Sequence, residues 1–152
     1  MANANDDKMD VLTGIIDKDS KTYSFEKELS VLGKRQKGAF VAKYMGIGAR
    51  LRMGTIRAKL LDGAPVDSVD TTTDDIAYMI AYLTVSLVKS PRWFNYDNLD
   101  YYEDLRELYT EVYRFMTNFR EQNEQDSNAG NSENAAGTPS VESVQRTAIA
   151  AE

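Results

Sequence analysis

The sequence predicts an α+β fold in which an N-terminal β-hairpin packs on three α-helices, with a disordered N-terminal arm and a disordered C-terminal tail. Two observations lead to this prediction. Every aromatic residue of the 152-residue chain lies between residues 21 and 120, together with most of the large aliphatic side chains. Within that stretch the spacing of apolar residues changes once, from the alternation typical of strands to the three-and-four spacing typical of helices. About 100 residues can bury one modest core, so we expect a single domain there.

The two ends of the chain lack the composition of a folded core. Residues 1–20 are rich in Asp, Asn and Lys apart from an apolar patch at 11–16, and residues 121–152 contain no aromatic side chain. Such segments bury too little apolar surface to offset the conformational entropy lost on ordering. We expect a flexible arm over residues 1–20, a single α+β domain over 21–120 and a disordered polar tail over 121–152.

Alternating apolar residues predict the two strands of the hairpin. Alternation places one face of a strand in the core and the other in solvent. Residues 33–38 have glycine at both ends and long polar side chains between them, which favours a hairpin loop there. The first run consists of Tyr23, Phe25, Leu29 and Val31, and the second of Phe40, Ala42 and Tyr44.

A first helix is expected from residue 48 to the stop signal at Asp62-Gly63. An amphipathic helix normally turns its apolar face to the core. Gly54 lies in the middle of this helix, where glycine costs about 1 kcal/mol relative to alanine, and its presence predicts the close approach of another backbone. The apolar face carries Ile47, Leu51, Ala58 and Leu61, and Met53, Ile56 and Leu60 widen it.

A second helix is expected over residues 74–89. Thr72 and Asp75 resemble a capping box at its start, and Ser90-Pro91 ends it. Residues 76–88 are apolar around nearly the whole circumference, so this helix is either central in the fold or covered by a partner chain.

A third, strongly amphipathic helix is expected from about residues 97–100 onward. Its acidic residues Asp100, Glu103, Asp104 and Glu107 are most simply a solvated helix start. Its apolar seam, at spacings of three and four, consists of Leu105, Leu108, Val112, Phe115, Met116 and Phe119.

Composition excludes several kinds of site. The chain has no Cys and no His, so it lacks the residues of a zinc finger, a disulfide framework or a Ser-His-Asp triad. Gly46-Ile47-Gly48 and the Gly33 to Gly38 spacing match neither a dinucleotide fingerprint nor a P-loop, because the other required residues are missing. The aspartates between residues 67 and 75 lack the pattern of an EF-hand. We expect no enzymatic activity, no cofactor and no metal.

A membrane partner is not expected either. The polar, acidic N-terminus is unlike a signal peptide, and the longest apolar stretch, residues 76–88, is shorter than the ~18 residues needed to cross a bilayer. The lack of Cys is consistent with a cytosolic protein.

Charge is distributed unevenly. Between Glu28 and Asp62 there are eight basic and no acidic residues, whereas residues 62–152 carry 17 acidic and six basic residues. The basic stretch either packs against acidic helices of its own chain or of another copy, or binds an acidic protein or a nucleic acid. Residues 21–120 are nearly balanced, with 15 basic and 13 acidic residues, so we favour intrachain packing or self-association and expect no nucleic-acid partner. A nucleic-acid site, the remaining alternative, would use Lys34, Arg35, Lys37 and Arg50–Lys59.

The segments between residues 21 and 120 follow one another in a fixed order. The order is the hairpin, Gly46-Ile47-Gly48-Ala49-Arg50-Leu51-Arg52, Ala58-Lys59-Leu60-Leu61-Asp62-Gly63, Ala77-Tyr78-Met79-Ile80-Ala81-Tyr82-Leu83, Ser90-Pro91-Arg92-Trp93-Phe94, and Leu108-Tyr109-Thr110-Glu111-Val112 ending at Phe119-Arg120. This order resembles that of the tail assembly chaperones of long-tailed bacteriophages, and the resemblance leaves the C-terminal tail outside it.

The resemblance implies a non-catalytic factor in the cytoplasm of an infected bacterium. Such a factor would bind and solubilise the tape measure protein, recruit tail tube subunits and be absent from the mature virion. The alternative is a structural tail or connector subunit that stays in the virion. Tyr78, Tyr82 and Val85, or Trp93 and Phe94, are our candidates for the docking surface, because aromatic residues often anchor interfaces. The other interpretation of the run at residues 93–96 is that it plugs the end of the helical layer.

Overall fold

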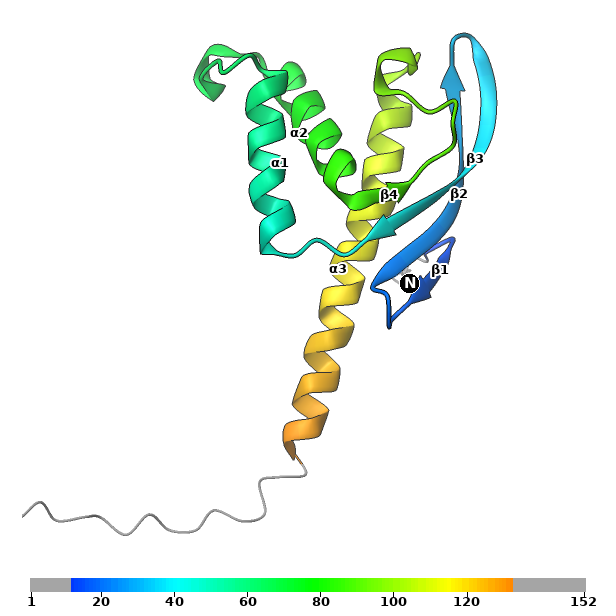
Figure 1. The fold of residues 1–152 in the computed structure, drawn as a ribbon, viewed down its shortest axis with the longest axis vertical. Helices are drawn as coiled ribbons and strands as arrows, with labels where there is room; N and C mark the ends of the chain where they lie inside the picture. The colour runs from blue at the N-terminus through cyan, green and yellow to red at the C-terminus, as the bar shows by residue number, and fades with distance from the viewer. Residues whose placement is uncertain (1–11, 133–152) are drawn as a thin grey trace, which may run out of the picture. The chain divides into compact units, whose positions relative to one another are not determined.

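The computed structural model describes residues 12–132. The chain divides after Arg120 into two units. The first unit contains an antiparallel sheet, helices α1 (Ile47–Leu60) and α2 (Thr71–Ser86), and the first part of α3 (Tyr102–Ser132), as Figure 1 shows. The prediction of an α+β fold with an N-terminal hairpin and three helices is therefore confirmed. In the second unit, residues 121–132 are helical.

Regular structure extends beyond the expected domain at both ends. Residues 15–17, which we assigned to the arm, form strand β1 (Ile15–Asp17), and residues 121–132, which we assigned to the tail, continue α3. The rest of the predicted arm and tail, residues 1–11 and 133–152, lies outside the described residues.

The sheet has four strands in the order β1-β2-β3-β4. Strands β2 (Thr22–Val31) and β3 (Lys34–Lys43) pair along their whole length, with Phe25 opposite Phe40. Strand β4 (Leu87–Lys89) pairs with β3 on the other side. The predicted alternation is confirmed, because the inward-facing residues of both strands are buried: Tyr23, Phe25, Leu29, Val31, Phe40 and Ala42.

The hairpin turn is shorter than predicted. Residues 34–38, which we assigned to a loop, belong to β3, and the chain reverses at Leu32 and Gly33. Both have positive φ, 50° and 75°, as a two-residue hairpin turn of type I′ requires. Leucine rarely adopts this conformation, and tertiary hydrogen bonds hold it here: Leu32 N donates to Asn98 O at 3.2 Å, and Gly33 N donates to the Asp100 carboxylate at 2.8 Å.

Both ends of α2 differ from the prediction. The helix is capped by Asp70, whose carboxylate accepts from Thr73 N at 3.0 Å, and not by Thr72 with Asp75. It ends at Ser86, and residues 87–89 turn into β4 instead of continuing the helix.

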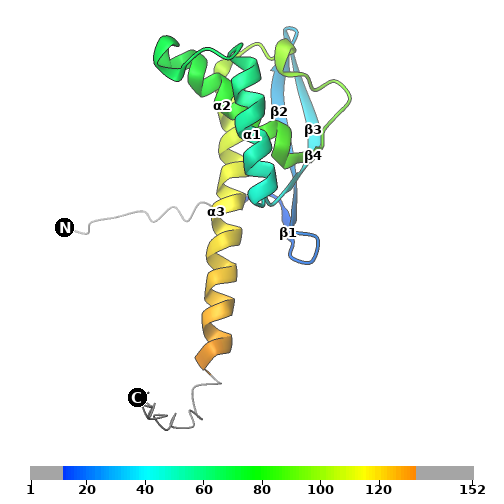
Figure 2. The same cartoon turned by 60° about the vertical axis from the view of Figure 1, so that its left-hand side comes forward.

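The core lies between the sheet and the helices. Tyr23 of β2 stacks on Phe115 of α3 with ring centroids 5.2 Å apart, and Tyr44 meets Phe119 at 5.0 Å. Helix α2 supplies Met79, Tyr82 and Leu83 to the same cluster, so it is central in the fold. Helix α1 packs chiefly on α2; it lies at the edge of the helical layer in Figure 1 and in front of α3 in Figure 2.

Candidate partner-binding surface

The candidate docking residues on α2 lie mostly inside the fold. Tyr82 is 4% exposed, and Tyr78 and Val85 are half-buried. The Tyr82 ring lies 6.2 Å from that of Tyr78 and 5.0 Å from that of Tyr109. Burial raises the pKa of Tyr82 above its ordinary value. Tyr82 therefore supports the packing of α2 on α3 and presents almost no surface to a partner.

Trp93 and Phe94 pack on the sheet. Both rings meet Phe40 edge-on, at centroid distances of 6.4 and 5.2 Å. A side chain at Gly38 would collide with Pro91 and the Trp93 ring, so the glycine lets this segment lie directly on β3. These contacts are those expected of a plug for the end of the helical layer.

A surface pocket of about 640 Å³ adjoins this plug. Trp93 and Phe94 line it together with Leu83 and Leu87 of the α2–β4 segment and with Arg92. Burial also raises the pKa of Tyr96 in the pocket wall. Of the candidate docking residues, Trp93 and Phe94 line this pocket, whereas Tyr78 and Tyr82 face the tyrosines of α3, so the two groups do not form one surface.

Helix α1 carries an exposed stripe of apolar and small residues, three of which we expected to find in the core. None of its residues is buried. Ile47 is 87% exposed and Leu51 is 75% exposed, and Gly54 and Ala58 are exposed as well. These four residues, which we call the α1 stripe, follow the spacing i, i+4, i+7 and i+11 of a helix–helix seam. The expectation that this face packs in the core is wrong for Ile47, Leu51 and Ala58, whereas Leu61, directly after the helix, is buried as expected.

The opposite side of α1 is the one that packs on the fold. Ala49, Met53 and Ile56 are half-buried, and Ala49 and Met53 contact the core cluster. The expected neighbour of Gly54 is missing among the described residues, because a Cβ at that position would meet nothing within 4 Å. Gly54 therefore has no packing role within the described part of the chain.

An ion pair fixes this orientation of α1. Arg57 donates through Nε to Asp74 Oδ1 of α2 at 2.9 Å, and a second contact joins Nη2 to the same oxygen. The guanidinium also lies 5.7 Å from the centroid of the Tyr78 ring, within the range of a cation–π interaction. Hydrogen bonding to Asp74 raises the pKa of Arg57.

The basic stretch divides into paired and unpaired residues. On the hairpin, Arg35 pairs with Glu28 at 3.1 Å, and Lys37 pairs with Glu26 at 2.7 Å. The pKa of both cations is raised, in each case chiefly by hydrogen bonding to that glutamate. In the part of the chain that the structure describes, three basic residues of α1 take part in no ion pair: Arg50, Arg52 and Lys59.

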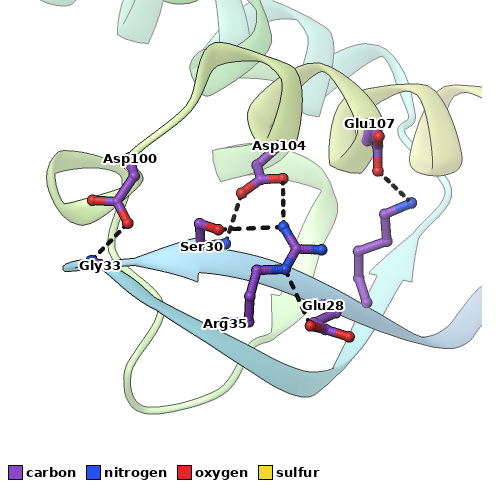
Figure 3. Close-up of polar contacts among 8 residues, drawn as sticks. Glu28, Ser30, Gly33, Arg35, Asp100, Asp104 and Glu107 are labelled. Carbon is purple, nitrogen blue, oxygen red and sulfur yellow. Dashed lines mark hydrogen bonds and ion pairs between the residues drawn. The ribbon is translucent and has the colours of Figure 1, made fainter.

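The acidic start of α3 is not simply solvated. Figure 3 shows its carboxylates directed at the hairpin. Asp104 is buried and accepts from Ser30 N at 2.6 Å and from Arg35 Nη1 at 3.4 Å. Glu107 pairs with Lys27 at 3.1 Å, which accounts for the one charged residue on the buried face of β2. These groups join α3 to the sheet and have no need of an external ligand.

Residues 12–132 contain neither a metal-like cluster nor a bilayer-spanning helix. No three acidic side chains in this range gather as a cation site would require. None of the helices described there is both long and apolar enough to cross a membrane.

No protein-family model, curated protein or solved structure matches this chain. The α1 stripe is an exposed apolar surface of the described residues from which a function can be argued. The spacing of the stripe and the lack of acidic residues in α1 could be seen in the sequence, but the exposure of the stripe could not.

Proposed function

We propose that this protein is a non-enzymatic tail assembly chaperone of the kind found in long-tailed bacteriophages, and that it binds the tape measure protein through the α1 stripe. The observation that carries the proposal is the exposure of Ile47 and Leu51 on a helix that buries none of its residues. Covering a side chain of this size stabilises a complex by roughly 1.5–3 kcal/mol. A helix with apolar residues at the same spacing is the natural complement of such a stripe.

The composition of the chain supports a binding role. A protein with no His lacks the side chain that most often acts as a general acid or base, and one with no Cys lacks a thiolate nucleophile. Binding an apolar helix requires neither of these side chains. The chaperone would act in the cytoplasm of the infected host, keep the tape measure protein soluble, recruit tail tube subunits and leave before the virion is complete.

Co-expression with the tape measure protein tests this proposal. Leu51→Asp should lower the amount of soluble tape measure protein, because a carboxylate in the seam must be desolvated when the partner helix docks. Ile15→Asp is the matched control, since Ile15 is 78% exposed and lies on β1, away from α1. Both variants should stay folded by circular dichroism. Equal recovery with the wild type and folded Leu51→Asp would overturn the proposal.

A structural subunit is the competing function. It would expose an apolar stripe before assembly and cover it in the finished tail, so the stripe alone does not separate the two. Mass spectrometry of purified particles distinguishes a chaperone from a structural subunit. A chaperone is absent from them, and a tail or connector subunit is present in a fixed ratio to the tube protein.

A further inference from the structure

We infer that the partner of the α1 stripe is an acidic amphipathic helix of another protein, with glutamates or aspartates flanking its apolar seam. This inference rests on the proposed function and specifies the chemistry of the partner segment. It follows from the charges around the stripe, from the space at Gly54 and from the composition of α1 itself.

The charges beside the stripe all have one sign. With 3.6 residues per turn, Arg50 lies about 70° to one side of the centre of the stripe, and Lys59 and Arg52 lie about 110° and about 130° to the other side, beyond the flanking positions of Gly48 and Thr55. All three are exposed, and α1 contains no acidic residue. The fourth cation of the helix, Arg57, is already paired with Asp74. A docked helix with carboxylates on its flanks would pair with Arg50 and be attracted by Arg52 and Lys59, whereas the same cations would repel a helix with basic flanks.

The middle of the stripe accepts a close partner backbone or a large partner side chain. Gly54 is exposed, and nothing lies within 4 Å of the position of a Cβ there. Packed helices are separated by 8–10 Å, depending on the side chains at the contact. Ile47 and Leu51 then provide apolar knobs on one side of this opening.

Other occupants fit these features less well. Two copies of α1 packed together would bring the three unpaired cations of one helix near the three of the other. Nucleic acid would use the cations, but Ile47 and Leu51 would face its phosphates. An anionic membrane surface would meet two large apolar residues, a small area for insertion. An acidic helix matches both the apolar centre of the stripe and the exposed cations of α1.

Two synthetic helical peptides test the inference with the full-length protein. They share leucines at the seam positions and differ only in their flanks, which are all glutamate in one and all lysine in the other. We expect the glutamate peptide to bind about tenfold tighter or better by fluorescence anisotropy, and this preference to shrink between about 0.05 and about 0.5 M salt. Comparable affinities for the two peptides, or a preference for lysine flanks, would overturn the inference.

A matched pair of charge variants locates the effect. Arg50→Glu/Lys59→Glu should abolish or invert the preference for the glutamate peptide, whereas Lys34→Glu/Lys43→Glu should retain it. The second pair changes the net charge equally at exposed residues of β3. The same loss of preference in both variants would contradict a site on α1.

Three further measurements distinguish the acidic helix from the other possible partners of the α1 stripe. Duplex DNA or anionic vesicles that bind more tightly than the glutamate peptide, or a dimer in sedimentation that Leu51→Asp dissociates, would overturn the inference in favour of that occupant. The proposed function is tested separately, by the recovery of soluble tape measure protein with Leu51→Asp. If tape measure recovery depends on Leu51 but the peptides do not discriminate, the chaperone proposal stands and the acidic partner does not.

Discussion

Arg57 of α1 donates through Nε to Asp74 Oδ1 of α2 at 2.9 Å, and this pair determines which side of α1 faces solvent. Leu51 is six residues earlier, about 120° around the helix from Arg57. Holding the guanidinium against α2 and over the Tyr78 ring therefore turns Leu51 outward. The exposure of the α1 stripe is a consequence of this polar contact as well as of the half-buried Ala49, Met53 and Ile56.

Removing the pair should loosen α1. We expect Arg57→Met and Asp74→Asn each to lower the free energy of unfolding by about 1 kcal/mol, as for a charged hydrogen bond that is partly exposed. Urea denaturation of both single variants and the double variant measures the coupling. Strictly additive single effects would show that the two residues contribute independently.

Gly54→Ala should stabilise the protein. An added methyl group meets open space, and alanine is better than glycine by about 1 kcal/mol in a helix interior, so the melting temperature should rise. If a partner backbone passes close to Gly54, the same variant should weaken tape measure binding. A fall in melting temperature would mean that Gly54 has a packing role that the described residues do not reveal.

Gly38→Ala should have the opposite effect. The new methyl group collides with Pro91 and with the Trp93 ring, so it forces the aromatic segment away from β3. Overpacking of this kind costs about 1–3 kcal/mol. Trp93 is the only tryptophan of the chain, so its emission should shift to longer wavelength as it becomes hydrated. Unchanged emission and stability would contradict the close approach at Gly38.

Stability should fall at alkaline pH. Burial, together with the hydrogen bond of its hydroxyl to Glu111 at 2.5 Å, raises the pKa of Tyr23 from 10.0 to about 12. The unfolded chain therefore releases this proton first, and the contribution is complete below about pH 10 and lost as the pH rises towards 12. Burial raises the pKa of Tyr82 and Tyr109 in the same direction. Urea midpoints measured at about pH 8 and about pH 11 test this. Tyr23→Phe should show a shallower fall, and an equal slope in both proteins would exclude Tyr23 as a contributor.

Much of the fold follows from local patterns. The alternation around Tyr23 and Phe40 and the three-and-four seam of α3 identify core faces, because a buried face repeats with the period of its element. The turn at Leu32 was missed because tertiary contacts hold a leucine at positive φ, which no turn preference anticipates. The N-cap of α2 was misplaced because Asp70 and Thr72, two positions apart, are both residue types that can cap a helix.

The candidate site could be predicted less well. Helix α1 has apolar residues on two sides, one carrying Ile47 and Leu51 and the other carrying Met53 and Ile56. Spacing alone cannot decide which side is buried, since the choice depends on a contact with a residue 17 positions away. Likewise, aromatic content pointed to Tyr82 as an anchor, but its ring is enclosed by α2 and α3.

Site-specific photocrosslinking in cells that also express the tape measure protein examines the α1 stripe most directly. A photoreactive phenylalanine analogue at Leu51 should crosslink to the tape measure protein, and the same group at the equally exposed Ile15 should not. Crosslinking at Met53, on the inward side of α1, should also be weak. A soluble complex that crosslinks through Ile15 or Trp93 and not through Leu51 would contradict the assignment of α1 as the docking surface.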